Sequence, residues 1–226
     1  MAIDTILFDA EGVIVDTEKV WDHGSTELLR RRGKVYDSKR TKPLLTGRSL
    51  PEGIRVMQEQ YGFDGDPEVL ARERLEIVRA LFAEVALMPG FLEFHARVHG
   101  RFKAAVATAM HEELLTPLDR RLGLTRLFDG HVYHLEHVGG RSKPNPDLFL
   151  YAAECLGSPP EHCLVLEDAP YGIEAARRAG MACIGLATTY PAEMLTAADR
   201  VVRSFAEIAL DDLPVQEPKT SCMPQA

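Results

Sequence analysis

The sequence predicts an α/β fold in which a parallel sheet, covered by helices, carries an inserted all-helical segment. Residues 3–8 form a short apolar run, typical of a buried strand, that ends at acidic and turn-forming residues. The next stretch of about seventy residues, roughly residues 17–87, has helical periodicity without a clear strand. From residue 88 onward, strand-like runs alternate with helical patterns, and such alternation implies right-handed crossovers and a parallel sheet.

The inserted segment contains three helical patterns. The first, residues 18–32, places apolar side chains among charged ones and can end at Gly33. The second begins at Pro51 and the third at Pro67, since proline is favoured in the first turn of a helix. We therefore expect an insertion made of helices alone.

The rest of the chain supplies the alternating elements. Helices are expected at residues 91–99, 112–122, 147–156 and 171–179, and strands at residues 102–107, 130–134, 163–166, 182–187 and 200–202. The tail, residues 214–226, is rich in proline, glutamine and serine and is expected to be disordered.

Composition excludes several classes of protein. The apolar fraction of 46% in 226 residues allows one core domain with a smaller insertion. A net charge of −8 gives no electrostatic support for a nucleic-acid partner. No apolar run approaches the roughly 20 residues of a membrane span, and no signal-peptide pattern is visible. The four cysteines lack C-x-x-C spacing. We expect a reduced, cytoplasmic protein without a membrane partner, and the oligomeric state is not predicted.

Polar residues follow several predicted strands, where ligands bind to open α/β sheets. These residues are Asp9 and Glu11 after the first strand, Thr108 after the second, Lys143 in a KPNPDLF segment, and Glu167 with Asp168 after a fourth. Each also has a simpler explanation: a strand-to-turn junction, a helix cap, a solvated loop lysine, or a strand end. All four segments in order, with alternating elements between them, favour a shared site.

Residues 8–18, FDAEGVIVDTE, resemble the first motif of the haloacid dehalogenase (HAD) superfamily. Thr108, residues 143–149 and residues 165–181 resemble the three later motifs. The likeness is to the phosphatase and β-phosphoglucomutase-like branch. It implies a Rossmann-like parallel sheet core with an inserted all-helical cap domain.

The implied domain boundaries follow from the same resemblance. They place residues 1–16 and 88–213 in the core, residues 17–87 in the cap, and residues 214–226 in the tail.

The resemblance implies roles for individual residues. Asp9 is the expected nucleophile, and it forms an aspartyl-phosphate that water later hydrolyses. Lys143 holds Asp9 ionised and balances the charge of the transferring oxygens, and Thr108 donates a hydrogen bond to the phosphate. Ala109 is a further expected substrate-binding residue. The expected ligands of Mg²⁺ are Asp9 and Asp168 together with the backbone carbonyl of Glu11, while Glu167 supports the waters of the metal.

Glu11 departs from the family pattern, which has an aspartate as general acid/base at this position. Glutamate keeps the carboxylate but moves it by about an ångström, and a misplacement of that size can cost about 10²-fold in rate. Three outcomes stay open for Glu11: slow catalysis, normal catalysis if the backbone compensates, or a long-lived phospho-enzyme.

Two further features concern the cap and a histidine series. Arg48, in a segment LTGRS that resembles a cap loop, suits an anionic substrate, although a surface arginine in a turn is an equal alternative. The linkers near residues 15–17 and 88–90 are candidate hinges. His131, His134 and His137 suggest a metal site, but a strand and its following loop should make the rings diverge, so surface histidines are favoured.

The combined expectation is Mg²⁺-dependent hydrolysis of a small phosphomonoester, such as a sugar phosphate, by a HAD-like phosphoric monoester hydrolase. One alternative is a β-phosphoglucomutase-like phosphomutase. A second is a catalytically weak protein that binds a phosphorylated ligand or has a regulatory role, which Glu11 keeps open. The sequence does not identify the substrate.

Overall fold

The computed structural model of this chain describes residues 2–45, 49–82 and 84–213. Within these residues the strands form one parallel six-stranded sheet in the order β3-β2-β1-β4-β5-β6. The strands are β1 (Thr5–Phe8), β2 (Lys103–Ala107), β3 (Val132–Tyr133), β4 (Cys163–Glu167), β5 (Ala182–Leu186) and β6 (Arg200–Val202). This order is that of a Rossmann-like sheet, which confirms the predicted fold class.

Helices cover both faces of the sheet. One face packs on α5 (Phe91–Val98), α6 (Glu112–Leu122) and α7 (Leu124–Leu127), and the other on α8 (Asp147–Cys155) and α9 (Pro170–Arg178). The alternation along β1 separates the two cores, because Ile6 and Phe8 enter the first and Leu7 enters the second.

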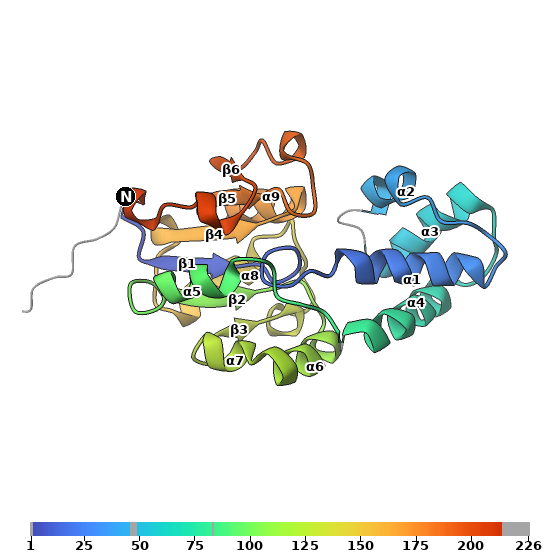
Figure 1. The fold of residues 1–226 in the computed structure, drawn as a ribbon, viewed down its shortest axis with the longest axis horizontal. Helices are drawn as coiled ribbons and strands as arrows, with labels where there is room; N and C mark the ends of the chain where they lie inside the picture. The colour runs from blue at the N-terminus through green and yellow to red at the C-terminus, as the bar shows by residue number, and fades with distance from the viewer. Residues whose placement is uncertain (1, 46–48, 83, 214–226) are drawn as a thin grey trace, which may run out of the picture.

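Strand β1 lies at the centre of the sheet between β2 and β4. Phe8 is in register with Val106 on one side and with Leu166 on the other. The carboxyl ends of β1 and β4 therefore meet at one edge, and in Figure 1 both arrowheads point toward the helices inserted after β1. This edge collects the residues that follow the two strands.

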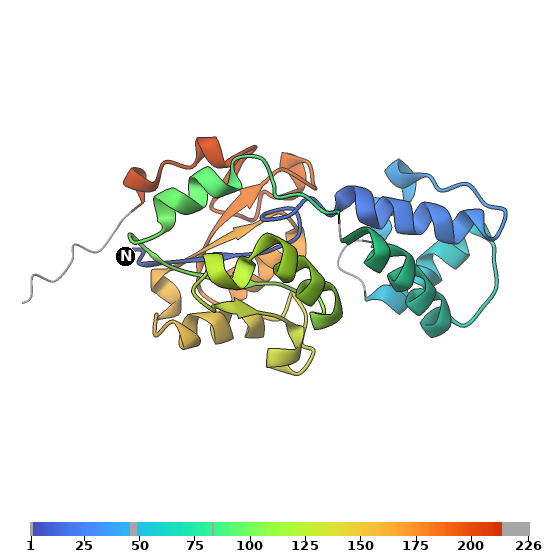
Figure 2. The same ribbon diagram turned by 60° about the horizontal axis from the view of Figure 1, so that its bottom comes forward.

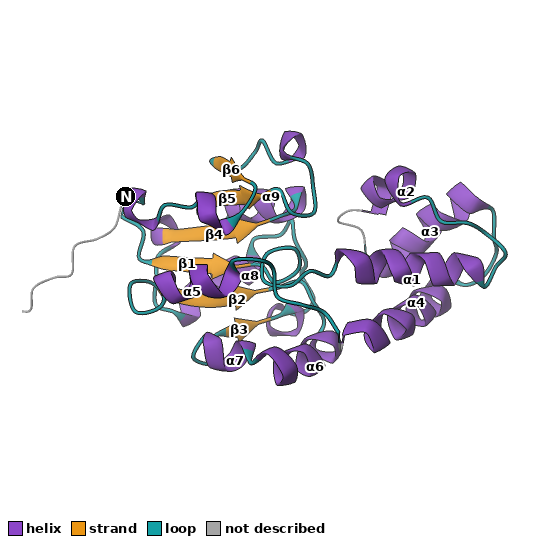
Figure 3. Cartoon of the chain, viewed as in Figure 1, coloured by secondary structure: helices purple, strands orange, loops and turns teal. Residues whose placement is uncertain are grey.

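The inserted helices have a small core of their own. They are α1 (Glu18–Arg30), α2 (Ser38–Leu45), α3 (Leu50–Tyr61) and α4 (Pro67–Phe82). Leu28 and Leu29 of α1 pack with Ile54 and Met57 of α3 and with Leu70 of α4. Figures 2 and 3 show these helices as a lobe beyond the end of the sheet. The boundaries proposed for a core and a cap stay a prediction.

Two α-helices among the described residues, α2 and α7, were not predicted from the sequence. In α2 the buried residue is Thr41, and Pro43 interrupts the pattern, so an amphipathic periodicity is missing. Helix α7 has 4 residues, too few to display a period. All the helices and strands that the sequence predicts are present, and for most of them the ends differ from the prediction by one or two residues.

The two segments that join the lobe to the sheet are hydrogen-bonded to each other. The amide of Asp16 donates to the carbonyl of Ala86 at 3.0 Å, and the amide of Met88 donates to the carbonyl of Ile14 at 2.8 Å. A paired connection of this kind can bend as one unit, which suits the proposed hinge role of both linkers.

No helix among the described residues is long and apolar enough to cross a membrane. The tail, residues 214–226, and Arg48 lie outside the described residues.

Candidate active site

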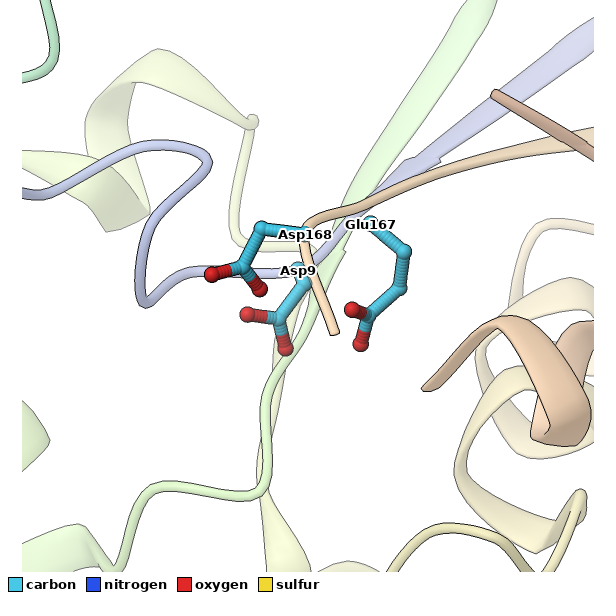
Figure 4. A group of neighbouring side chains, drawn as sticks. All are labelled: Asp9, Glu167 and Asp168. Carbon is cyan, nitrogen blue, oxygen red and sulfur yellow. The ribbon is translucent and has the colours of Figure 1, made fainter. Parts of the chain in front are cut away.

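Three acidic side chains converge at the carboxyl ends of β1 and β4. Asp9 follows β1 directly, Glu167 ends β4, and Asp168 comes next. The amide of Asp9 donates to the carbonyl of Leu166 at 3.0 Å, which holds the two strand ends together. Oxygen atoms of the three carboxylates lie within 4.8 Å of one another, and Figure 4 shows the carboxylates turned toward a common region.

Lys143 brings the opposite charge to this cluster. Its Nζ donates to Oε1 of Glu167 at 2.6 Å and is paired with Oδ1 of Asp9. Lys143 comes from the loop before α8, where the peptide bond to Pro144 is cis. Burial alone would lower the pKa of Lys143, but Asp9 and Glu167 together raise it above its ordinary value. The lysine is therefore held as a cation.

Two glycines make room for the acidic cluster. A Cβ atom on Gly12 would lie 2.0 Å from Oδ2 of Asp168, and Gly12 has a positive φ of 71°. A Cβ atom on Gly172 of α9 would lie 1.7 Å from Oε1 of Glu167. Any side chain at either position would displace a carboxylate, so both glycines shape the site.

The charge balance of the cluster fits a divalent cation. Burial raises the pKa of Asp9 to about 7, in opposition to Lys143, and burial with the nearby Glu167 and Asp9 raises the pKa of Asp168. Both shifts express the excess of three buried carboxylates over one ammonium group. Hard carboxylate oxygens facing a cavity are suitable ligands for Mg²⁺, so the residues present fit that ion.

Glu11 lies beside this cluster, and its side chain is held by the inserted helices. Oε1 of Glu11 accepts a hydrogen bond from Nε1 of Trp21, on α1, at 2.6 Å. Burial raises the pKa of Glu11, and hydrogen bonds from Trp21 and Thr17 oppose the shift. The side chain of Glu11 is not one of the three that converge, whereas its backbone role at a metal stays a prediction.

Trp21 itself is half-buried and also packs edge-to-face on Phe82, with ring centroids 6.2 Å apart. Its indole ring therefore both packs and donates a hydrogen bond to Glu11. A spacing of ten residues between Glu11 and Trp21 does not predict this hydrogen bond from the sequence.

Thr108 and Ala109, the two predicted site residues that follow β2, lie outside the acidic cluster. Thr108 is fully buried, and its Oγ1 accepts a hydrogen bond from the amide of Met110 at 3.1 Å. Thr108 does not cap α6, which begins at Glu112. Ala109 lines the cavity above the acidic cluster. The roles predicted for Thr108 and Ala109 stay predictions.

The histidine series forms a small network near β3. Nδ1 of His134 contacts Oε2 of Glu136 at 2.7 Å, and the rings of His134 and His137 are 4.1 Å apart. His131 instead contacts the hydroxyl of Tyr133 at 2.8 Å. Among the described residues, the group with a metal-ligating arrangement is Asp9, Glu167 and Asp168.

A cavity of about 1170 Å³ joins the acidic cluster to the inserted helices. Its lining includes Asp9, Glu11 and Lys143 on the sheet side, and Trp21, Tyr36 and Arg74 on the helical side. Sequence reasoning did not single out Tyr36 or Arg74. Arg74 is one of several charged residues on a helical pattern, and periodicity alone does not say which of them faces a ligand.

Comparison with known proteins identifies one family, which both a family model and a relative of known activity support. The model of the family described as haloacid dehalogenase-like hydrolase matches residues 3–180. Fructose-1-phosphate phosphatase YqaB of Escherichia coli is 35% identical over 176 residues, which cover 78% of this chain and 92% of the relative.

Two solved structures are similar over nearly the whole chain. A HAD family hydrolase from Deinococcus radiodurans, with bound phosphate and sodium, has a TM-score of 0.75 and 31% identity, and the match covers 91% of this chain and 93% of the other. CbbY from Rhodobacter sphaeroides, in complex with xylulose-(1,5)bisphosphate, has a TM-score of 0.78 and 29% identity, with 94% and 100% covered.

Proposed function

Since this chain belongs to the haloacid dehalogenase-like hydrolase family, we propose that it is a Mg²⁺-dependent phosphatase that hydrolyses a small phosphorylated sugar or a related phosphomonoester. A buried aspartate, Asp9, lies beside Lys143 and Asp168 in the wall of a large cavity, and this arrangement supports phosphoryl transfer more directly than any other feature of the chain. The relative from E. coli is a sugar-phosphate phosphatase, which supports the substrate class.

Asp9 and Asp168 would hold the Mg²⁺ ion, with Glu167 beside them in contact with Lys143. When bound, the ion neutralises charge on the phosphate oxygens and lowers the repulsion between an anionic nucleophile and an anionic ester. Lys143 contributes a fixed cation at Oδ1 of Asp9. The phosphate and sodium ions in the D. radiodurans relative support the presence of anion and cation sites in this fold.

The covalent step uses the oxygen of Asp9 that is not paired with Lys143. Oδ2 forms a bond to phosphorus while the bond from phosphorus to the ester oxygen breaks, and Glu11 gives its proton to that leaving oxygen. A water molecule then attacks the phosphorus of the aspartyl-phosphate and gives a proton to Glu11. Inorganic phosphate leaves, and the carboxylate of Asp9 is restored.

A panel of phosphorylated sugars tests this function directly. We expect phosphate release in the presence of Mg²⁺, its loss on addition of EDTA, and its recovery when Mg²⁺ is added in excess. Mg²⁺ alone should also raise the midpoint temperature of unfolding, because an ion that binds only the folded chain stabilises it. Release that does not respond to EDTA would contradict the proposal. Isomerisation without net phosphate release would instead indicate a mutase.

Shortening Glu11 tests whether the site is built around the longer side chain. Glu11→Asp withdraws the carboxylate by about one methylene from Nε1 of Trp21, and we expect kcat to fall about 10- to 100-fold. Trp21→Phe, which removes the same hydrogen bond but keeps an aromatic ring, should show a loss of similar size. The double variant should lose little more than either single one. Additive losses, or a faster Glu11→Asp enzyme, would mean that Trp21 does not position Glu11.

A further inference from the structure

Arg74 is a buried cation that forms no salt bridge with any carboxylate of the described residues. It lies on α4, has 6% of its surface exposed, and lines the cavity above Asp9. Among the described residues, its Nε is the buried side-chain nitrogen or oxygen that has no hydrogen-bond partner. Its Nη2 reaches the carbonyl of Trp21 only at 3.5 Å. The guanidinium group is thus under-satisfied within the protein.

The packing of α1 on α4 fixes where this group lies. A Cβ atom on Gly24 of α1 would lie 2.5 Å from Val78 and 3.7 Å from the Cγ atom of Arg74, so the two helices approach closely at this glycine. The stem of Arg74 lies in that interface, and its guanidinium group lies over the ring of Trp21, 5.1 Å from the centroid. The head group is therefore held in one place at the cavity wall.

The nearest charged and titratable groups do not neutralise Arg74. Tyr36 and Asp22 act on Arg74 only through space and raise its pKa, without a hydrogen bond or salt bridge to the guanidinium group. Oδ2 of Asp22 accepts a hydrogen bond from Ser38 at 2.8 Å. Burial lowers the pKa of Arg74 to about 10, so it is still a cation at neutral pH. A buried cation without a partner is costly, and the planar fork of arginine matches carboxylate and phosphate groups.

The indole of Trp21 lies in contact with both Glu11 and Arg74. One edge of the ring donates to Glu11, and the guanidinium group of Arg74 lies over the ring face. Glu11, Trp21 and Arg74 line the same cavity, so a substrate whose leaving oxygen is at Glu11 has room to extend past Trp21 toward Arg74. We propose that Arg74 binds a second anionic group, a carboxylate or a second phosphate, on the part of the substrate beyond the ester that is cleaved. The proposal rests on the phosphatase function above and narrows its substrate class to phosphorylated sugars or sugar acids that carry a second anionic group besides the phosphate that is cleaved.

Matched substrate pairs test this selectivity. The compounds 6-phosphogluconate and glucitol 6-phosphate share a carbon chain and differ in a carboxylate at one end. Fructose 1,6-bisphosphate and fructose 1-phosphate differ in a second phosphate. We expect kcat/KM to favour the more anionic member of one pair, and Arg74→Gln to reduce that ratio about 10- to 100-fold. Arg74→Lys should keep part of the preference. The pair that responds identifies the group.

The ratio separates recognition from folding, because a smaller folded fraction lowers both rates of a pair equally. Arg55→Gln is the matched control, since Arg55 is exposed on α3 and lies outside the cavity lining. It removes the same charge and should leave both rates unchanged. The proposal would be overturned if Arg74→Gln left the ratio of the two kcat/KM values unchanged. It would also be overturned if the wild type showed no preference for the more anionic member of either pair. Arg74 would then be a packing residue for Trp21.

Calorimetric binding separates the failure of this inference from that of the proposed function. The Asp9→Asn protein, with and without Arg74→Gln, is titrated with both members of each pair. If the member with the second anionic group binds in a manner that depends on Arg74, but the wild type does not turn it over, only the phosphatase function is contradicted. If the wild type turns over the compound, but the Asp9→Asn protein binds it equally well with and without Arg74→Gln, only the role of Arg74 is contradicted.

Discussion

Replacing Asp9 by asparagine is expected to abolish phosphate release while leaving the fold intact. An amide oxygen does not form the phospho-acyl bond, and loss of a nucleophile lowers kcat by about 10⁴-fold or more. The side chain keeps its size and a hydrogen-bond acceptor for Lys143, so the cluster keeps its packing. Phosphate release from the best substrate of the panel measures the effect, with circular dichroism and thermal unfolding as checks of structure.

Asp64→Asn is a suitable control for this variant. Asp64 is exposed and lies outside both the cavity lining and the converging carboxylates. It should retain most of the wild-type rate. Substantial turnover by folded Asp9→Asn protein would show that phosphorus is attacked directly by water and would remove the covalent step.

Replacing Lys143 by methionine is expected to affect both activity and stability. The change leaves Asp9, Glu167 and Asp168 buried together without their cation. Removing one partner of a buried ion pair destabilises a protein by about 3 to 5 kcal/mol. We expect a fall of that order in the free energy of unfolding, together with a loss of turnover of about 10³-fold, since a fixed charge at the reacting group is removed. Chemical denaturation and phosphate release measure the two effects.

A second substitution distinguishes charge from packing. Lys143→Met combined with Glu167→Gln removes one positive and one negative charge, so it should recover part of the stability but not the activity. Arg141→Met is the exposed control, because Arg141 pairs with Asp147 at the surface, where such pairs contribute about 0 to 1 kcal/mol. Equal losses in the free energy of unfolding for Lys143→Met and Arg141→Met would mean that the buried ion pair contributes no more to stability than an exposed one.

The centre of the sheet was predictable because β1 and β4 are buried along their whole length. A strand such as β1 reads as a continuous apolar run, and Asp9 at its end marks the edge where ligands bind. Lys143 and Asp168 were identified as site residues through motifs that match a known family. Helix α2 was missed because its one buried residue and its internal proline leave no period to detect.

By itself, the sequence determined the α/β class, the alternating elements and the acidic residues at two strand ends, because these depend on local patterns of apolar and polar residues. Tertiary structure alone decided the strand order, the contact of Glu11 with Trp21, and the position of Arg74 over that ring. Each of these joins residues that lie on different elements of the fold, so no pattern within one element predicts it. Helices α1 and α4 approach closely at Gly24, and no local pattern records that Nε of a buried arginine is left without a hydrogen-bond partner there.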